Sequence, residues 1–266
     1  MSNEIKGYGW RPVAKAELSN YRPQSGKIMK GGLFVRAEIK NHMEKYQVDL
    51  SCCTPSDAAE YENFSDYLSR SFAEGARPVD TAPNSLIAPC DGYITAHFIN
   101  SMCLIPVGSH MYSVEKLLGG DTRAKEFAEG MALIIRLGEG DPHRFVYADD
   151  GACGDSFTIA AEKNLEDSMF FGARSCTFMD TKHFFGIAQV EACGNAKGIE
   201  QFSLGESPVF VKGREKGRFL CGGAGLLLLF KKGMMFPDDE IMVNTRNGLE
   251  TRVKLGEKIG VAIAVG

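Results

Sequence analysis

The sequence predicts an α+β protein with a β-rich core, sandwich-like or barrel-like, and a helical N-terminal extension. The chain has 266 residues, of which 44% are hydrophobic and 24% charged, as in ordinary globular domains. Helix-compatible residues occupy the first 83 positions, and short apolar runs separated by Gly, Asp, Asn and Pro follow from about residue 85. We therefore divide the chain into a helical extension, residues 1–83, and a β-rich core, residues 84–266.

Two stretches of the extension have helical character. Residues 30–48 mix apolar and charged positions, and residues 56–72 place aromatic and apolar side chains at helical spacing behind Ser56, a predicted N-cap. Gly and Pro residues between 75 and 83 end the helical pattern. Inside the core, residues 112–119 predict one short helix that stops at Gly119-Gly120.

The core is predicted to consist of short strands joined by tight turns. Asp149-Asp150-Gly151 and Asn247-Gly248 are turn signals typical of hairpins, so neighbouring strands should be antiparallel. The predicted strands are Tyr93–Ile99, Met102–Val107, Ala132–Leu137, Cys176–Met179, Gly186–Ala192, Pro208–Val211, Gly225–Phe230, Glu240–Val243 and Val261–Val265.

Charge and composition exclude several classes of protein. Thirty Lys and Arg against 34 Asp and Glu give a formal net charge of −4, which offers no basic field for nucleic acid. The charge-free apolar run at residues 219–230 is shorter than the roughly 20 residues that span a bilayer. No apolar segment follows a basic start, so we expect a cytoplasmic protein. The eight cysteines form no C-x-x-C pair, so we expect reduced thiols and no metal site.

Two polar residues stand beside predicted strands. Asp91 lies in Pro89-Cys-Asp-Gly92, where Asp-Gly alone is a common hairpin turn. His143 follows an apolar strand and is flanked by Asp141 and Arg144, although a single histidine is more often a structural hydrogen-bonding group than a catalyst. Taken singly, both residues leave a structural and a functional role open.

A glycine cluster, Gly222-Gly223-Ala224-Gly225, precedes the apolar strand that ends at Phe230. It could form a bulge or a close backbone approach. It could also cradle a phosphate, but the spacings of phosphate-binding loops are missing and no helix follows. Residues 61–80, taken alone, are typical of an ordinary amphipathic helix and loop.

Together and in order, these segments resemble the phosphatidylserine decarboxylase family of pyruvoyl-dependent lyases. The resemblance covers about three quarters of the chain, from Tyr61 to the C-terminus, and several motifs in register make it specific. The motifs are the aromatic/Asp helix followed by Gly75-Ala-Arg-Pro78, then Ala88-Pro-Cys-Asp-Gly92, Tyr112-Ser-Val-Glu-Lys-Leu-Leu-Gly119, Ile135-Arg-Leu137, Asp141-x-His-Arg-Phe145 and Gly217-x-Phe-x-x-Gly-Gly223 before an apolar strand.

The resemblance implies a carboxy-lyase that first cleaves itself. In such enzymes a serine attacks the carbonyl of the preceding glycine, and β-elimination leaves a pyruvoyl group on the new N-terminus. That group forms a Schiff base with the substrate amine and takes up the electrons released as CO₂ leaves. Carried over to this sequence, Asp91 orients the base, His143 is base and later proton donor, Gly223 holds the scissile carbonyl, and residue 224 is the nucleophile and cofactor position.

The sequence departs from the family at two positions. The nucleophilic serine falls on Ala224, which has no hydroxyl and can neither attack Gly223 nor become a pyruvoyl group, so we expect one uncleaved, inactive precursor. An engineered serine-to-alanine substitution would agree with the retained Asp91 and His143; a natural, non-catalytic paralogue that serves as a binding partner is the alternative. Val146 stands where many members have the second histidine of His-Arg-x-His, so His143 serves both steps or another group helps.

The predicted substrate is an amine bearing a carboxylate, either phosphatidylserine or a free amino acid, because both present the same reacting groups. Residues 31–35 and 169–172 are candidates for peripheral membrane contact, and core or dimer packing would also explain them. The family resemblance implies a homodimer, which no feature of the sequence supports independently.

Overall fold

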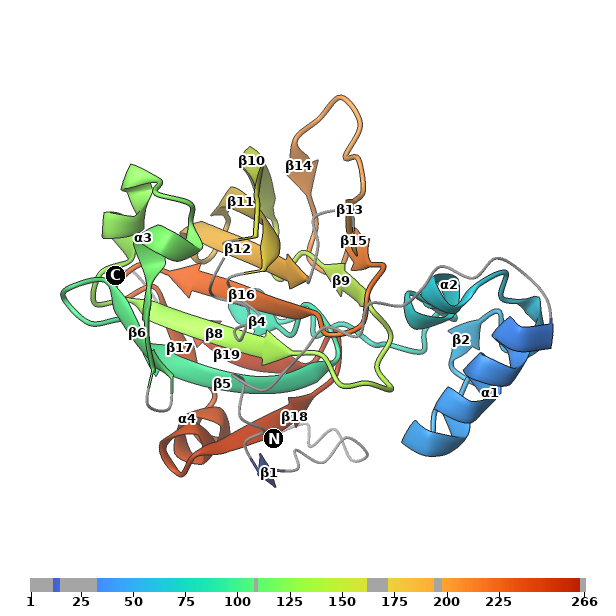
Figure 1. Cartoon of the computed structure of the whole chain (residues 1–266). Coiled ribbons are helices and arrows are strands. Elements are labelled where there is room, and N and C mark those ends of the chain that lie inside the picture. The colour runs from blue at the N-terminus through green and yellow to red at the C-terminus, as the bar shows by residue number, and fades with distance from the viewer. Residues whose placement is uncertain (1–11, 15–32, 108–109, 162–171, 194–197, 264–266) are drawn as a thin grey trace.

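A nine-stranded antiparallel sheet forms the centre of the computed structural model, with the N-terminal helices beside it (Figure 1). The structure describes residues 12–14, 33–107, 110–161, 172–193 and 198–263. The strand order in the large sheet is β1-β18-β5-β8-β16-β12-β11-β10-β14. Its strands are β1 (Pro12–Ala14), β5 (Gly92–Phe98), β8 (Met131–Arg136), β10 (Gly151–Ile159), β11 (Ala173–Thr181), β12 (Phe185–Cys193), β14 (Val209–Phe210), β16 (Gly225–Phe230) and β18 (Leu249–Val253).

Smaller sheets complete the β structure and confirm the β-rich α+β prediction. One has the order β13-β15-β9 and another β17-β19-β4, and two hairpin-like pairs are β2-β3 and β6-β7. Their strands are β2 (Cys53–Thr54), β3 (Ser71–Phe72), β4 (Ser85–Ile87), β6 (Leu104–Val107), β7 (His110–Ser113), β9 (Arg144–Val146), β13 (Ile199–Gln201), β15 (Glu215–Phe219), β17 (Met235–Pro237) and β19 (Lys258–Ala262).

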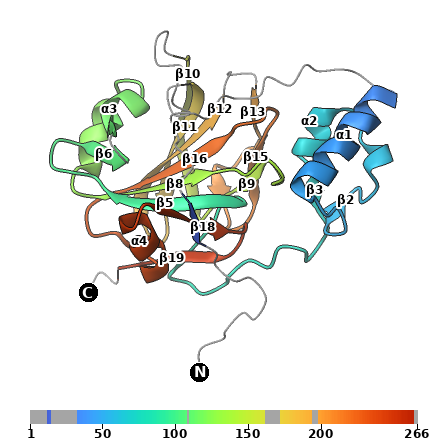
Figure 2. The same cartoon turned by 60° about the horizontal axis from the view of Figure 1, so that its bottom comes forward.

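The helices are short and lie around the sheets (Figure 2). They are α1 (Leu33–Tyr46), η2 (Ala58–Glu60), α2 (Phe64–Leu68), α3 (Val114–Leu117), η3 (Thr122–Phe127) and α4 (Asp239–Arg246). The single helix predicted over 56–72 is divided in two, because Asp57 caps η2 and Asn63 caps α2 by accepting from Asp66 N. The predicted cap Ser56 was therefore wrong. Helix α3 confirms the short helix predicted there.

The predicted strand at 240–243 was also wrong, because those residues lie within helix α4. Asp239 and Glu240 form an acidic first turn, which favours a helix N-terminus, and Ile241 is buried. Asn247-Gly248 ends this helix rather than forming a hairpin, and Gly248 has φ +73°. Likewise Asp149 to Gly151 joins β9 to β10, which belong to different sheets.

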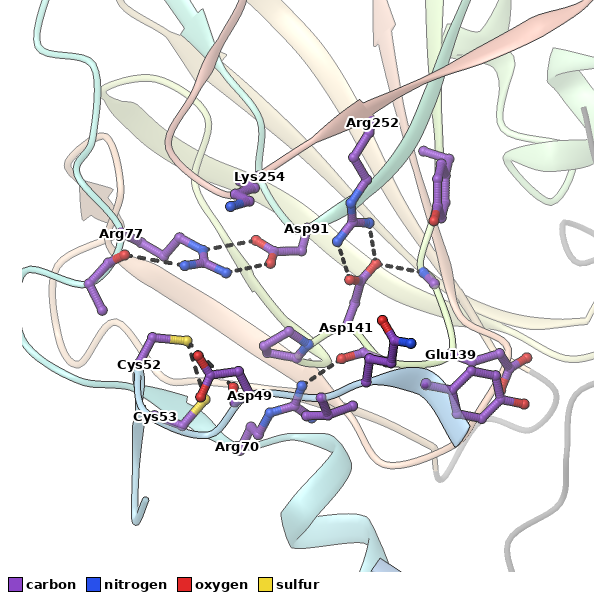
Figure 3. Close-up of a pocket in the computed structure, with 18 of the residues that line it drawn as sticks. Asp49, Cys52, Cys53, Arg70, Arg77, Asp91, Glu139, Asp141, Arg252 and Lys254 are labelled. Carbon is purple, nitrogen blue, oxygen red and sulfur yellow. Dashed lines mark hydrogen bonds and ion pairs between the residues drawn. The ribbon is translucent and has the colours of Figure 1, made fainter. Parts of the chain in front are cut away.

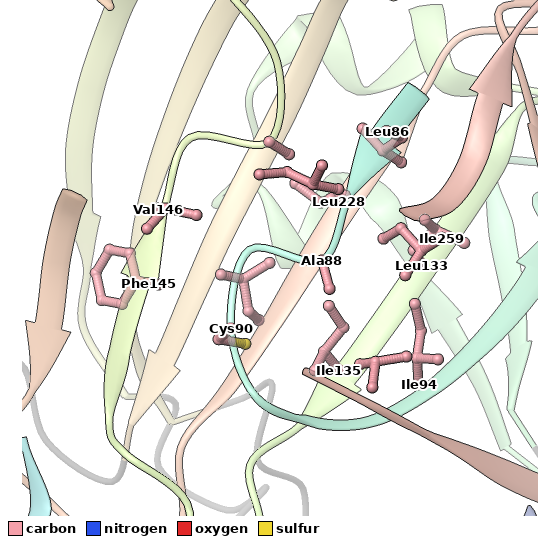
Figure 4. Close-up of a cluster of buried hydrophobic side chains, with 14 of the residues drawn as sticks. Leu86, Ala88, Cys90, Ile94, Leu133, Ile135, Phe145, Val146, Leu228 and Ile259 are labelled. Atoms are coloured by element: carbon pink, nitrogen blue, oxygen red, sulfur yellow. The ribbon is translucent and has the colours of Figure 1, made fainter. Parts of the chain in front are cut away.

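Central strands β8 and β16 are buried on both faces of the large sheet. Successive residues of β16 alternate between two apolar clusters: Leu226 and Leu228 enter one, and Leu227 and Leu229 enter the other. Figure 4 shows part of the first cluster, to which Leu133 of β8 also contributes. This double burial explains the unbroken apolar run that identified β16 in the sequence.

The N-terminal extension has a small apolar cluster of its own, formed by Val35, Ile39, Leu50, Cys53, Tyr61, Tyr67 and Leu68. Figure 1 places α1, α2 and β2 beside the large sheet rather than on either of its faces. Strand β1 behaves differently, because it pairs with β18 at the edge of that sheet. The division at residues 83 and 84 stays a prediction of domain organisation.

One expectation about the cysteines was wrong, because a disulfide joins Cys193 and Cys221. Cys193 ends strand β12, and Cys221 lies in the loop that precedes β16. The other cysteines are free thiols.

Within the described residues, no helix has the length and apolar character needed to cross a membrane. Residues 31–32 and 169–171, part of the two segments considered for membrane contact, lie outside the described residues.

Candidate active site

Asp91 lies in the connection between β4 and β5, two strands of different sheets, so its Asp-Gly sequence does not form a hairpin. The side chain is only 2% exposed, and the Arg77 guanidinium binds both of its oxygens, with Nε to Oδ1 at 3.2 Å and Nη2 to Oδ2 at 2.8 Å. The backbone N–H of Leu255 donates to Oδ1 at 2.8 Å. Asp91 is therefore a fully partnered, buried carboxylate whose partner cation comes from the Gly75-Ala-Arg-Pro78 motif.

His143 precedes strand β9 and reaches the glycine cluster. Its Nδ1 lies 2.8 Å from the carbonyl oxygen of Cys221, which can only accept, so Nδ1 carries the proton and Nε2 keeps its lone pair. The main chain is fixed on both sides, because His143 N–H donates to Leu68 O and Phe219 N–H donates to His143 O, each at 2.8 Å. Burial, followed by the charge of Arg70, lowers the pKa of His143 to about 4. The imidazole is thus neutral at pH 7.

Ala224 is completely buried at the start of β16. The N–H of Leu137 donates to its carbonyl at 3.1 Å, which ties residue 224 to the strand end of β8. Gly223 has φ +77°, a conformation that a residue with a Cβ adopts only with strain. The predicted need for glycine at the scissile position therefore has a conformational basis.

The structure does not bring all the predicted catalytic residues together. Among the described residues, the hydrogen bonds of Asp91 go to Arg77 and Leu255, and none joins it to His143. The carboxylate that acts electrostatically on His143 is Asp141, which raises the pKa of the imidazole. Asp141 is itself held by Arg252 and by the N–H of Gly138.

The backbone of Val146 is hydrogen-bonded to the connection that carries Asp91, although the two residues are far apart in the sequence. Its N–H donates at 2.8 Å to the carbonyl of Pro89, two residues before Asp91. Its side chain belongs to the same buried apolar cluster as Cys90 and Ala224, and Figure 4 shows Val146 and Cys90 in that cluster. Val146 and Ala224 thus belong to the same core cluster, and the Pro89 carbonyl joins position 146 to the connection that carries Asp91.

A cavity of about 760 Å³ is lined by Asp91 and by Pro142, the residue before His143, but not by His143 or Ala224 (Figure 3). Its charged lining residues are Arg70, Arg77, Arg136, Arg252, Lys254, Asp49, Asp91, Glu139 and Asp141. Figure 3 shows the Arg77–Asp91 and Arg252–Asp141 pairs on one side, with Arg70 and Asp49 opposite. Five cations against four carboxylates give this polar lining a small positive excess, which suits an anionic small molecule or headgroup.

Comparison with known proteins assigns this arrangement to a family. The family model described as phosphatidylserine decarboxylase matches residues 64–261. The chain belongs to this family. It is similar to phosphatidylserine decarboxylase proenzymes of Clostridium perfringens, with 32% identity over 85% of this chain and 80% of the relative, and of Ruminiclostridium cellulolyticum, with 32% identity over 86% and 79%. A proenzyme of Fusobacterium nucleatum is 29% identical over 85% and 78%.

The phosphatidylserine decarboxylase family is pyruvoyl-dependent. At position 224, where the sequence analysis expects the serine that becomes this group, the chain has a buried alanine, whose methyl group carries no oxygen. No three His, Cys, Asp or Glu side chains in the described part of the chain are placed to hold a metal ion.

The sequence analysis did not single out Arg70, Glu139 or the Arg77–Asp91 pair. Arg70 follows Tyr67 by three residues, a helical spacing that predicts the observed stacking of its guanidinium near the Tyr67 ring, with Cζ 5.1 Å from the centroid. Arg77 and Asp91 are 14 residues apart, and only the family order of their motifs could have suggested that they meet.

Proposed function

We propose that this chain is a non-processing member of the phosphatidylserine decarboxylase family: it has the fold and cavity of a proenzyme for a serine-phospholipid carboxy-lyase, and it stays in one piece. Ala224 carries this proposal. Self-cleavage needs a hydroxyl that attacks the carbonyl of Gly223, and the buried methyl of Ala224 cannot supply one. Without cleavage no pyruvoyl group forms, so the chain has no electron sink for decarboxylation.

Val146 supports the same conclusion independently. A base for the attack must lie within hydrogen-bond reach of residue 224 and be oriented by a carboxylate. Position 146 shares an apolar cluster with Ala224, and its backbone is bonded to the Asp91 connection. His143 instead donates to Cys221 O and has no hydrogen bond to Asp91. We infer that a histidine at position 146 would serve as the processing base.

The chain lacks both a hydroxyl at position 224 and a histidine at position 146. These two differences favour a chain that has lost self-processing over a chain in which one engineered substitution blocks it. The cavity retains its buried charged residues, which supports a role in binding an amine-bearing carboxylate such as the headgroup of phosphatidylserine. A homodimer, which the family resemblance implies, and peripheral membrane contact, for which residues 31–35 and 169–172 are the candidates, are part of this proposal.

Three variants test the proposal on a denaturing gel with intact-mass analysis. The unaltered chain should give one band at 29.0 kDa. Ala224→Ser alone should also stay whole, because it lacks the base, whereas Ala224→Ser/Val146→His should divide between residues 223 and 224. Cleavage of the unaltered chain would overturn the proposal, and cleavage of Ala224→Ser alone would show that His143 suffices as base.

The cleaved double variant then tests the substrate class. CO₂ release should be faster from vesicles containing phosphatidylserine than from free amino acids. Rapid turnover of a free amino acid with none of the lipid would assign the soluble alternative instead. Adding His143→Gln to the double variant should abolish CO₂ release while leaving cleavage intact, because His143 is the proposed proton donor to product.

A further inference from the structure

Arg70 is a buried cation that neither the fold nor the processing chemistry explains. It follows helix α2, is 3% exposed, and lines the cavity opposite the Arg77–Asp91 pair (Figure 3). Arginine stays protonated at any physiological pH, so its charge cannot be removed by titration. A buried charge of this kind is costly unless a group of opposite charge accompanies it.

The described residues give Arg70 no such partner. Its Nη1 donates to Tyr67 O at 3.2 Å and its Nη2 to Gly140 O at 2.6 Å, both neutral carbonyls. Its Nε–H is buried without a hydrogen-bond acceptor. The three other arginines of the cavity each bind a carboxylate. The pairs are Arg77–Asp91, Arg136–Glu250 and Arg252–Asp141.

Four of the titratable groups around Arg70, namely His42, His143, Cys53 and Tyr67, are neutral at pH 7 and do not offset its charge. Burial and the Arg70 charge lower the pKa of His42 and of His143 to about 4. Burial raises the pKa of Cys53 to about 11 and that of Tyr67 to about 12. Asp49 and Glu139 also line the cavity, but neither lies within 4.0 Å of the guanidinium among the described ion pairs. Arg70 therefore leaves an unmatched positive charge at the cavity wall.

We propose that Arg70 binds the phosphodiester oxygens of a serine-type headgroup. The inference rests on the proposed function, which places that headgroup in this cavity. A guanidinium edge binds phosphate oxygens through paired N–H donors, and Arg70 has N–H groups beyond the two that the carbonyls occupy. The Nε–H would gain an acceptor through a small rotation of the guanidinium.

The reacting carboxylate is the less suitable partner for Arg70. In an active member of the family, decarboxylation removes negative charge from that carboxylate, so a cation bound to it would stabilise the starting state more than the transition state. The phosphodiester keeps its charge throughout the reaction. A cation on the phosphodiester therefore contributes binding without opposing the chemistry, and we assign Arg70 to the phosphodiester.

The experiment is calorimetric titration of the full uncleaved chain with three soluble ligands and one competitor. Glycerophosphoserine carries both the phosphodiester and the carboxylate, glycerophosphoethanolamine only the phosphodiester, and free serine only the carboxylate. Both phosphodiesters should bind, and serine should bind at least about 10-fold more weakly, as expected for loss of a charge-assisted hydrogen bond. Inorganic phosphate is the competitor that separates a free-phosphate site from a headgroup site.

Arg70→Gln should weaken both phosphodiesters at least about 10-fold and leave serine unchanged. Arg36→Gln is the matched control, because it removes the same charge from an exposed position of α1 and should change nothing. Arg70→Lys keeps the positive charge but lacks the planar guanidinium that donates paired hydrogen bonds, so it should weaken phosphodiester binding by less than Arg70→Gln. It serves as the test variant if Arg70→Gln does not fold.

Three results with the unaltered chain would overturn the assignment: equal binding of serine and glycerophosphoserine, no binding of either phosphodiester, and binding of inorganic phosphate without the headgroups. Unchanged binding of the phosphodiesters by Arg70→Gln would also overturn it. If Arg70→Gln does not fold, unchanged binding by Arg70→Lys would do so instead. None of these outcomes bears on whether the chain cleaves itself, so a failure here is distinguishable from a failure of the proposed function.

Discussion

His143 should make the fold sensitive to mild acid by an amount that follows from its burial. The side chain is 2% exposed, and burial with the Arg70 charge lowers its pKa from 6.5 to about 4. In the unfolded chain the imidazole titrates at its ordinary pKa, so between about pH 6.5 and 4 the unfolded state binds the extra proton. The contribution of His143 to the free energy of unfolding is fully present above pH 6.5 and is lost as the pH falls through 4. At 1.36 kcal/mol per pKa unit, the loss is about 3 kcal/mol.

Urea denaturation followed by circular dichroism from pH 7 to pH 4 measures this loss. His143→Gln is the comparison, because glutamine does not titrate and keeps an amide N–H for the Cys221 carbonyl. His42, whose pKa is also lowered to about 4, contributes to both curves and is removed by subtraction. The difference between the two free energies of unfolding should shrink by about 3 kcal/mol toward low pH. Parallel curves would refute the assignment of a buried, neutral His143.

Two further perturbations test the geometry of the site. Arg77→Met should reduce the free energy of unfolding, measured in urea, by about 3–5 kcal/mol, because it leaves the buried Asp91 carboxylate unpaired. Arg77→Met/Asp91→Leu should recover most of that loss. Equal destabilisation by the single and double variants would contradict the ion pair. Gly223→Ala should cost about 1–2 kcal/mol, because its φ is +77°. Gly120→Ala, at φ +86° in open space, is its control for strain alone, and a Gly223→Ala chain as stable as the parent would show that position 223 does not require glycine.

The strands that the sequence predicted best are those buried on both faces. Strand β16 has the predicted bounds, because an apolar run of five residues between a glycine cluster and Lys231 leaves little choice for where the strand lies. Residues 240–243 were assigned wrongly because a run of four residues with apolar character fits a strand or a helix equally well. The acidic first turn at Asp239-Glu240 was the signal for a helix N-terminus, and burial of Ile241 favours the same helix.

The candidate site was predictable as a set of segments but not as a set of contacts. The motif order identified Asp91, His143 and residue 224, yet the hydrogen bond from His143 crosses 78 residues to Cys221. No local pattern shows that Asp91 pairs with Arg77 rather than with His143. Arg70 falls in a segment that the sequence predicts as an amphipathic helix, and the sequence alone does not show whether an arginine there is exposed or buried.

The distribution of changes across the site argues for a retained binding role. Positions 146 and 224, where we propose that processing needs a base and a hydroxyl, both hold aliphatic side chains of one apolar cluster. These two side chains therefore leave no buried polar group unpartnered at either position. The cavity keeps the ion pairs Arg77–Asp91 and Arg252–Asp141. Buried ion pairs add little net stability compared with apolar residues of similar size, so folding alone gives weak reason for them. Their presence beside Arg70 is the composition that we expect, under the proposed function, of a site that binds the net-negative serine headgroup without converting it.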